Sequence, residues 1–68
     1  MDCKALGARI AEAVDAKGMN TKQFASCMGV SYSTASSYMR GDRVPTLDRL
    51  VRICWLLGTS ADHLLGLR

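Results

Sequence analysis

The sequence predicts an all-α fold, a compact five-helix domain spanning residues 1–68. Apolar residues recur at intervals of three and four along most of the chain, and no alternating apolar run of useful length predicts a strand. Glycine, Asn, Ser and Thr fall between the periodic segments, where they are typical of helix ends. Because 49% of the 68 residues are hydrophobic, the chain is expected to fold around one small core.

The first two helices are predicted from apolar faces and from the residues at their ends. The run from Lys17 to Asn20 ends the first helix. Asn20 is then the N-cap of a helix that begins at Thr21, and Gln23 can reach back to complete a capping box. Gly29 provides the left-handed position that ends this second helix. The residues expected to be buried are Leu6, Ile10, Ala13 and Val14 in the first helix and Phe24, Ala25 and Met28 in the second.

The third helix is predicted to follow Ser31, its N-cap, and to continue to Met39 or Arg40, with Gly41 ending it. Its hydroxyl-rich sequence favours caps and turns over helix interiors, so packing against the second helix must hold it. The residues expected to supply that packing are Thr34, Ala35 and Tyr38. Those expected to point outward are Tyr32, Ser33, Ser36 and Ser37.

Two further helices complete the prediction. Thr46 is the expected N-cap of the fourth helix, and Gly58 ends it. Ser60 caps the fifth helix. The residues predicted to face the core are Leu47, Leu50, Val51, Cys54 and Leu57 in the fourth helix and Leu64 and Leu65 in the fifth.

Charge and cysteine content restrict the function. The net charge is +3, and six basic residues against two acidic ones lie between Lys17 and Arg52, so the positive charge is central. The three cysteines are odd in number and far apart, which disfavours a disulfide framework and a metal site. Cys27 and Cys54 are predicted to be small buried residues, a usage that suits a reducing cytoplasm.

The sequence also disfavours an enzyme and a membrane protein. His63 is the sole histidine, and no base and nucleophile pair surrounds it. No apolar run approaches the ~20 residues of a membrane span, and the first ten residues lack the apolar core of a signal peptide. We therefore expect a cytoplasmic protein with no catalytic residue, no cofactor, no metal site and no membrane contact.

The second and third helices, joined by a glycine turn, describe a helix-turn-helix, a unit that can place its second helix in the major groove of DNA. Helical hairpins also occur in proteins that never contact DNA, so this pattern alone leaves the function open. Over nearly its whole length the chain resembles the helix-turn-helix domain of the lambda repressor and Cro class of transcription regulators (XRE type). The resemblance is carried by Gln23-Phe24-Ala25, Gly29-Val30-Ser31, Tyr38, Arg40-Gly41, Pro45-Thr46, Leu57-Gly58 and Leu64-Leu65.

The resemblance implies a regulator, most simply a repressor, that binds double-stranded DNA as a homodimer on a palindromic operator. It assigns base reading to Thr21, Tyr32, Ser33, Ser36 and Ser37, and phosphate contacts to Lys22, Gln23, Arg40 and Arg43. Since the reading face holds no Arg, Asn or Gln, specificity is expected to depend on water bridges, thymine methyl contacts and DNA shape.

Two departures from the family pattern carry expectations of their own. Val14 and Met39 stand where many members pair a buried Arg with a Glu, so we expect them to pack together. Trp55 replaces a usually polar residue and lies off the predicted buried stripe. With Leu56 and Leu67 it predicts an interface with a second copy or with another protein. The alternative function is therefore a protein-interaction module or an antitoxin-like protein that holds a partner through Trp55 and the C-terminal leucines.

Overall fold

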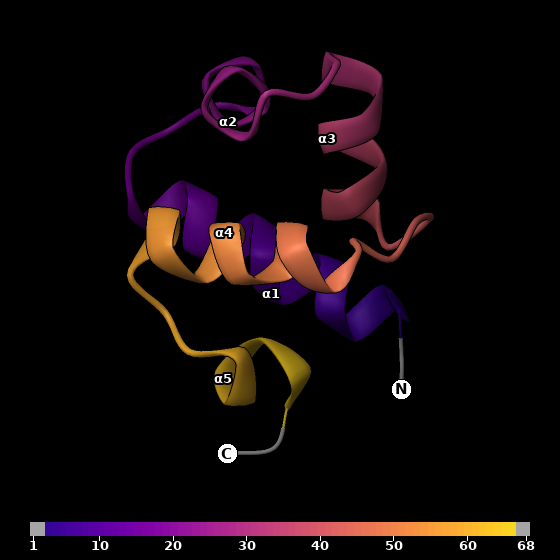
Figure 1. Cartoon of the computed structure of the whole chain (residues 1–68), viewed down its shortest axis with the longest axis vertical. Coiled ribbons are helices and arrows are strands. Elements are labelled where there is room, and N and C mark those ends of the chain that lie inside the picture. Colours follow the sequence, from indigo (N-terminus) through magenta and orange to yellow (C-terminus); the bar gives the residue numbers. More distant parts are fainter. Residues whose placement is uncertain (1–2, 67–68) are drawn as a thin grey trace.

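Five α-helices make up the part of the chain that the structure describes, residues 3–66. In this computed structural model they are α1 (Cys3–Ala16), α2 (Thr21–Met28), α3 (Tyr32–Arg40), α4 (Leu47–Leu57) and α5 (Ala61–Leu65). Residues 3–66 contain no strand, and the predicted all-α class is confirmed. In the view of Figure 1, α2 and α3 lie on one side of α4 and α5 lies on the other. No helix within this range is both long and apolar enough to cross a membrane.

The helix ends follow the predicted caps. Asn20 Oδ1 accepts a hydrogen bond from the backbone N–H of Gln23 at 2.8 Å, and Gln23 Oε1 accepts one from the backbone N–H of Asn20 at 3.0 Å. This capping box satisfies backbone donors that the start of a helix leaves without partners. Gly29, with φ of 69°, ends α2 as predicted. The helices α3, α4 and α5 begin in a similar way at the side chains of Ser31, Thr46 and Ser60.

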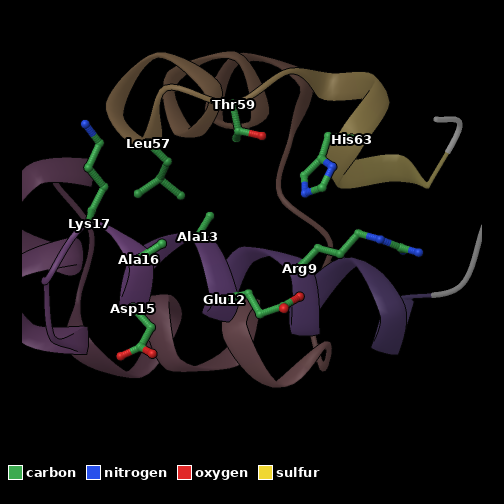
Figure 2. A pocket seen from close by; sticks show the side chains of 9 residues that line it. All are labelled: Arg9, Glu12, Ala13, Asp15, Ala16, Lys17, Leu57, Thr59 and His63. Atoms are coloured by element: carbon green, nitrogen blue, oxygen red, sulfur yellow. The ribbon is translucent and has the colours of Figure 1, made fainter.

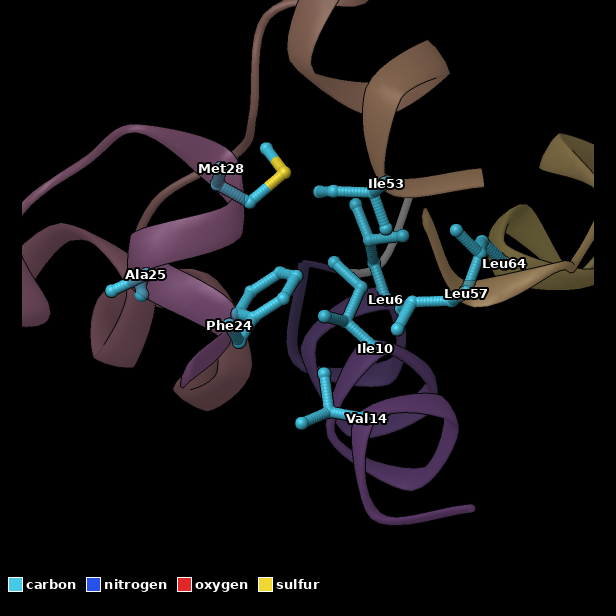
Figure 3. Close-up of a cluster of buried hydrophobic side chains, with 10 residues drawn as sticks. Leu6, Ile10, Val14, Phe24, Ala25, Met28, Ile53, Leu57 and Leu64 are labelled. Atoms are coloured by element: carbon cyan, nitrogen blue, oxygen red, sulfur yellow. The ribbon is translucent and has the colours of Figure 1, made fainter. Parts of the chain in front are cut away.

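The hydrophobic core lies between the helices, and each of the five contributes at least one side chain to it (Figure 3). α1 packs against α3 and α5, and α2 packs against α3 and α4. The predicted inner faces of α1 and α2 are confirmed, although Ala13 is only half-buried. Leu64 of α5 is fully buried as predicted, whereas the side chain of Leu65 is outside what the structure describes. The buried cluster consists of Leu6, Ile10, Val14, Phe24, Ala25, Met28, Ala35, Ile53, Leu57 and Leu64.

The prediction for the buried side of α4 is wrong in part. Leu47 and Val51, expected in the core, are 74% and 48% exposed. Ile53, which the predicted stripe omitted, has no exposed surface. Two apolar stripes with helical spacing run along this helix, and packing against α2 and α5 buries the one that contains Ile53 and Leu57. The other stripe is left on the surface.

The cysteine prediction is also corrected at one position. Cys27 is exposed, because the side of α2 that faces the core is already occupied by Phe24, Ala25 and Met28. Cys54 was expected to be buried; it is half-buried and packs against the core. Burial raises the pKa of the Cys54 thiol, which keeps it protonated and unreactive.

The start of α1 and the end of α3 approach each other at two glycines. A Cβ atom placed on Gly7 would lie 2.4 Å from the backbone N of Gly41 and 2.7 Å from its Cα. A Cβ atom on Gly41 would lie 2.5 Å from the carbonyl oxygen of Cys3, and Gly41 also has φ of 77°. Both positions therefore require glycine. This contact fixes the C-terminal end of α3 on α1.

Candidate nucleic-acid interface

α2, the turn and α3 form one closely packed unit. The turn contains Gly29, Val30 and Ser31, and the N–H of Val30 donates to the carbonyl oxygen of Ala25 at 3.1 Å. Ala25 and Ala35 are 4% and 0% exposed, so small side chains lie in the core where α2 and α3 pack. The predicted helix-turn-helix is therefore formed, with the outer side of α3 available to solvent.

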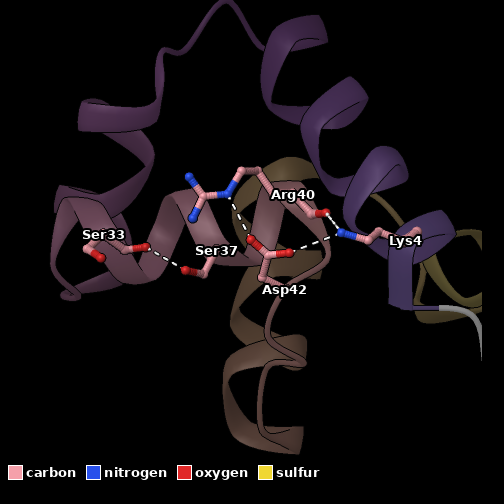
Figure 4. A network of polar contacts seen from close by, with 5 residues as sticks. All are labelled: Lys4, Ser33, Ser37, Arg40 and Asp42. Carbon is pink, nitrogen blue, oxygen red and sulfur yellow. Dashed lines mark hydrogen bonds and ion pairs between the residues drawn. The ribbon is translucent and has the colours of Figure 1, made fainter.

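The outer side of α3 is most accessible at its first turn. Tyr32 is 61% exposed, and Ser33 is exposed beside it. Ser36 and Ser37 were expected to point outward, and both are half-buried. The hydroxyl of Ser37 donates to the carbonyl oxygen of Ser33 at 2.9 Å (Figure 4). A hydroxyl engaged in this way has only its acceptor capacity left for a ligand.

Thr21, the first residue of α2, is half-buried. Its hydroxyl lies 3.7 Å from Sδ of Met39, at donor distance for a sulfur acceptor. This contact joins the start of α2 to the end of α3, so Thr21 has a structural role that the sequence did not predict. Met39 packs against the core cluster that contains Val14, and the two predicted apolar replacements thus share one core.

The polar residues expected to contact phosphates differ in their surroundings. Lys22 and Arg43 are exposed. Gln23 is exposed too, but its Oε1 atom is engaged in the capping box, which leaves its amide nitrogen as the group able to donate to a ligand. Arg40 is 61% exposed at its side chain, and its Nε donates to Oδ2 of Asp42 at 3.0 Å. Of the four candidates, Arg40 is thus the one shown bonded to an acidic side chain.

Asp42 connects α3 to the start of α1 as well as to Arg40 (Figure 4). Nζ of Lys4 lies 3.0 Å from Oδ1 of Asp42 and 3.4 Å from the carbonyl oxygen of Arg40. The hydrogen bonds from Lys4 and then Arg40 hold the pKa of Asp42 below its ordinary value of 3.8. A carboxylate of lowered pKa stabilises the fold above its ordinary pKa, and this contribution is lost as the pH falls through the folded pKa.

Replacing Asp42 should therefore have a pH-dependent effect. Asp42→Asn is expected to lower the melting temperature at neutral pH and to leave it unchanged in strong acid, well below 3.8. The change should be small and should shrink in high salt, because the side chains involved are well exposed. Thermal unfolding followed by circular dichroism measures it, with Glu12→Gln on α1 as a control for loss of an exposed carboxylate. If the melting temperature of Asp42→Asn stayed equally far below that of the wild type in strong acid, the Asp42 charge would not be the cause.

A hydrogen bond between α3 and α4 was not predicted from the sequence. Nη1 of Arg49 donates to the hydroxyl oxygen of Tyr38 at 2.7 Å, and Tyr38 is only 1% exposed. The sequence held one signal for it, since a buried tyrosine hydroxyl usually requires a polar partner. This bond holds α3 against α4 and gives Arg49 a structural role.

The residues expected at a protein interface differ in how much of their surface is exposed. Trp55 is 85% exposed on α4, as its place off the buried stripe predicted. Leu56 is half-buried and packs against the core, which limits what it can offer a partner. Leu67 lies outside the described residues. Of the three, Trp55 alone is shown as a large exposed apolar side chain.

An open pocket of about 710 Å³ lies between α1, the end of α4 and α5 (Figure 2). Arg9 and Glu12 of α1 lie on one side of it and His63 of α5 on the other. None of the polar or charged side chains that line it is buried. The pocket therefore offers no enclosed polar group to orient a small ligand.

Comparison with known proteins gives two findings. A family model described as "Helix-turn-helix domain" matches residues 5–65. The crystal structure of the clp gene regulator ClgR from C. glutamicum is similar, with a TM-score of 0.84 and 27% sequence identity over 97% of this chain and 86% of that chain. A search of curated proteins gave no match.

Proposed function

Because this chain belongs to the helix-turn-helix domain family, we propose that it is a DNA-binding transcription regulator whose α3 enters the major groove. The observation that carries the proposal is the chemistry around α3. Its first turn exposes Tyr32 and Ser33, which can form hydrogen bonds and carry no charge. The similarity to a gene regulator over 97% of the chain supports the same function.

Base reading in this proposal uses the residues that the resemblance assigns. Tyr32 and Ser33 supply the most accessible groups. Ser36 and Ser37 act from partly buried positions, and Thr21 from the start of α2. Hydroxyl groups pair with donors and acceptors alike, so each discriminates weakly between bases. Sequence preference should consequently be modest for one copy and should depend on DNA shape as well as on direct contacts.

Affinity in this proposal comes mainly from phosphate contacts. Lys22 and Arg43 bring exposed positive charge from the two ends of the unit, and the amide nitrogen of Gln23 donates beside the start of α2. Arg40 contributes after a phosphate oxygen replaces Asp42 as the acceptor from Nε, or through its other guanidinium nitrogens. The finer proposal is a repressor that binds as a homodimer, with half-sites ~34 Å apart.

Selection of bound sites from a random DNA pool at low salt tests this function directly. Enrichment of a motif, together with an affinity that falls steeply as salt rises, is the expected result. Failure to enrich any motif, with binding that hardly depends on salt, would count against DNA binding. That second outcome would favour a protein-interaction module or antitoxin-like protein, a function for which the exposure of Trp55 is the supporting observation.

Replacing Arg43 should weaken binding without changing the preferred sequence. Arg43→Ala is expected to lower affinity for the selected site and for random duplex alike, by about fivefold to tenfold, and to reduce the salt slope by about one phosphate contact. Fluorescence anisotropy across a salt series measures both quantities. Arg9→Ala removes the same charge from the open pocket between α1, the end of α4 and α5, and serves as the matched control. Equal losses in the two variants would show a net-charge effect and would contradict the role of Arg43.

A further inference from the structure

One face of α4 is apolar and is not covered by any other described part of the chain. Leu47, Val51 and Trp55 recur every four residues and therefore form a line along the helix, which we call the α4 stripe. Their exposed fractions are 74%, 48% and 85%. The opposite side of the same helix packs into the protein through Ile53 and Leu57.

The size of the α4 stripe indicates the strength of the association it can support. An aromatic side chain can bury up to ~250 Å², so Trp55 alone exposes roughly 200 Å². With Leu47 and Val51 the stripe reaches on the order of 400 Å², within the range of patches that are often functional on small proteins. A standard interface buries about 800 Å² per partner. The stripe is therefore sufficient for a weak complex.

The charges beside the α4 stripe favour a second copy of the chain over an acidic or basic partner. Asp48 and Arg52 lie one turn apart on the same flank of the stripe, and both are exposed. Their opposite charges leave this face of α4 close to neutral, so a copy approaching with the same face meets no net repulsion. The basic residues proposed for phosphate contact lie on α2, on α3 and in the loop after α3.

We propose that the α4 stripe is the surface through which two copies of this chain associate, with the two α4 helices side by side and pointing the same way. The orientation rests on the proposed function. The C-terminal part of α3 lies near the N-terminal end of α4 (Figure 1), where Arg49 of α4 donates to the hydroxyl of Tyr38. A parallel pair of α4 helices therefore brings both α3 helices to one end of the dimer, where one duplex can meet them, whereas an antiparallel pair sends them to opposite ends.

Sedimentation equilibrium tests the surface. The wild-type chain is expected to show a monomer–dimer equilibrium with a dissociation constant in the range of roughly 10 μM to 1 mM, since the stripe is about half of a standard interface. Trp55→Ser should weaken the dimer at least tenfold and leave the circular dichroism spectrum unchanged, because the side chain is exposed. Tyr32→Ser removes an exposed aromatic residue from α3 and should leave the equilibrium unaltered. A wild-type chain that stays monomeric at millimolar concentration, or equal weakening by both variants, overturns the proposal.

Cysteine cross-linking tests the orientation. In a chain that carries Cys27→Ser, to remove the exposed native thiol, Leu47→Cys and Trp55→Cys are introduced one at a time. The parallel arrangement predicts that each variant forms a disulfide-linked dimer with itself, and that Cys27→Ser alone does not. Cross-linking seen only in a mixture of the two variants would reveal an antiparallel pair and overturn the proposed arrangement.

Dimerisation through the α4 stripe and DNA recognition by one copy can be measured separately. Binding of Trp55→Ser to a duplex with one half-site measures DNA recognition by a single copy. Salt-dependent binding there, with no dimer in solution for the wild type, leaves the function standing and rejects the stripe. A dimer that forms through the stripe and binds no duplex rejects the function and the orientation derived from it.

Discussion

Gly7→Ala is expected to destabilise the protein by about 3 kcal/mol, although the change adds only one methyl group. In an ordinary helix interior this substitution is favourable by up to ~1 kcal/mol, because alanine has the higher helix propensity. Here the new Cβ would lie 2.4 Å from the backbone N of Gly41, and backbone atoms cannot rotate away as a flexible side chain can. The steric cost should exceed the gain, and α1 and α3 must separate to relieve it.

Thermal unfolding measures this effect. A loss of that size corresponds to a fall in melting temperature of roughly 12–24 °C for a domain of this length. Gly18→Ala is a useful comparison, since no atom lies within 4 Å of the added Cβ and only the cost of its φ of 73° remains. A melting temperature for Gly7→Ala at or above that of the wild type would show that the two helices can move apart freely.

Met39→Glu is the second substitution expected to have a large effect, with a loss of about 2 kcal/mol. Met39 packs against the core cluster that includes Val14, and its sulfur lies 3.7 Å from the Thr21 hydroxyl. A carboxylate there would lose water without gaining a cation. The loss is smaller than that of a fully buried charge because Met39 is half-buried.

Two further variants separate charge from shape at this position. Met39→Gln has a similar size and no charge, so it should cost less than Met39→Glu at neutral pH. The double variant Val14→Arg with Met39→Glu supplies the missing cation and should recover part of the loss. An unfolding midpoint for Met39→Glu equal to that of the wild type would contradict a shared apolar core for these residues.

The helix boundaries could be predicted from sequence because they are set by neighbouring residues. Asn20 and Gln23 are three residues apart and bond only to each other's backbone, so their pattern contains the whole interaction. The same holds for Ser31, whose hydroxyl accepts from the N–H of Thr34. The family resemblance adds the relative placement of the helices, which the similarity to a solved regulator bears out.

The inner side of α4 could not be predicted because apolar residues occur on more than half of that helix. Helical spacing fits the stripe with Leu47 and Val51 as well as the one with Ile53 and Leu57, and only contact with other helices decides between them. The ion pairs around Arg40 could not be predicted either, because they depend on contact between distant parts of the chain. The Lys4 ammonium that completes its cluster with Asp42 comes from a residue 38 positions away from that acid.

The predicted DNA contacts depend on the same distinction. Exposure of Tyr32 and Ser33 follows from their positions in the first turn of α3. The engagement of the Ser37 hydroxyl with a backbone carbonyl depends on a rotamer that spacing does not reveal. Sequence therefore defined the candidate face, and side-chain geometry ranks the hydroxyls within it.

The local nature of the helix ends bears on how quickly this chain folds. Four of the five helices begin at a side-chain cap and end at a left-handed glycine, so each is bounded by interactions between close neighbours. Helical domains dominated by such short-range contacts fold in microseconds to milliseconds. The contacts of α1 with α3 and α5 are the ones that close long loops, and they are expected to limit the rate. The α2–α3 pair, which joins neighbouring segments, can assemble before that step.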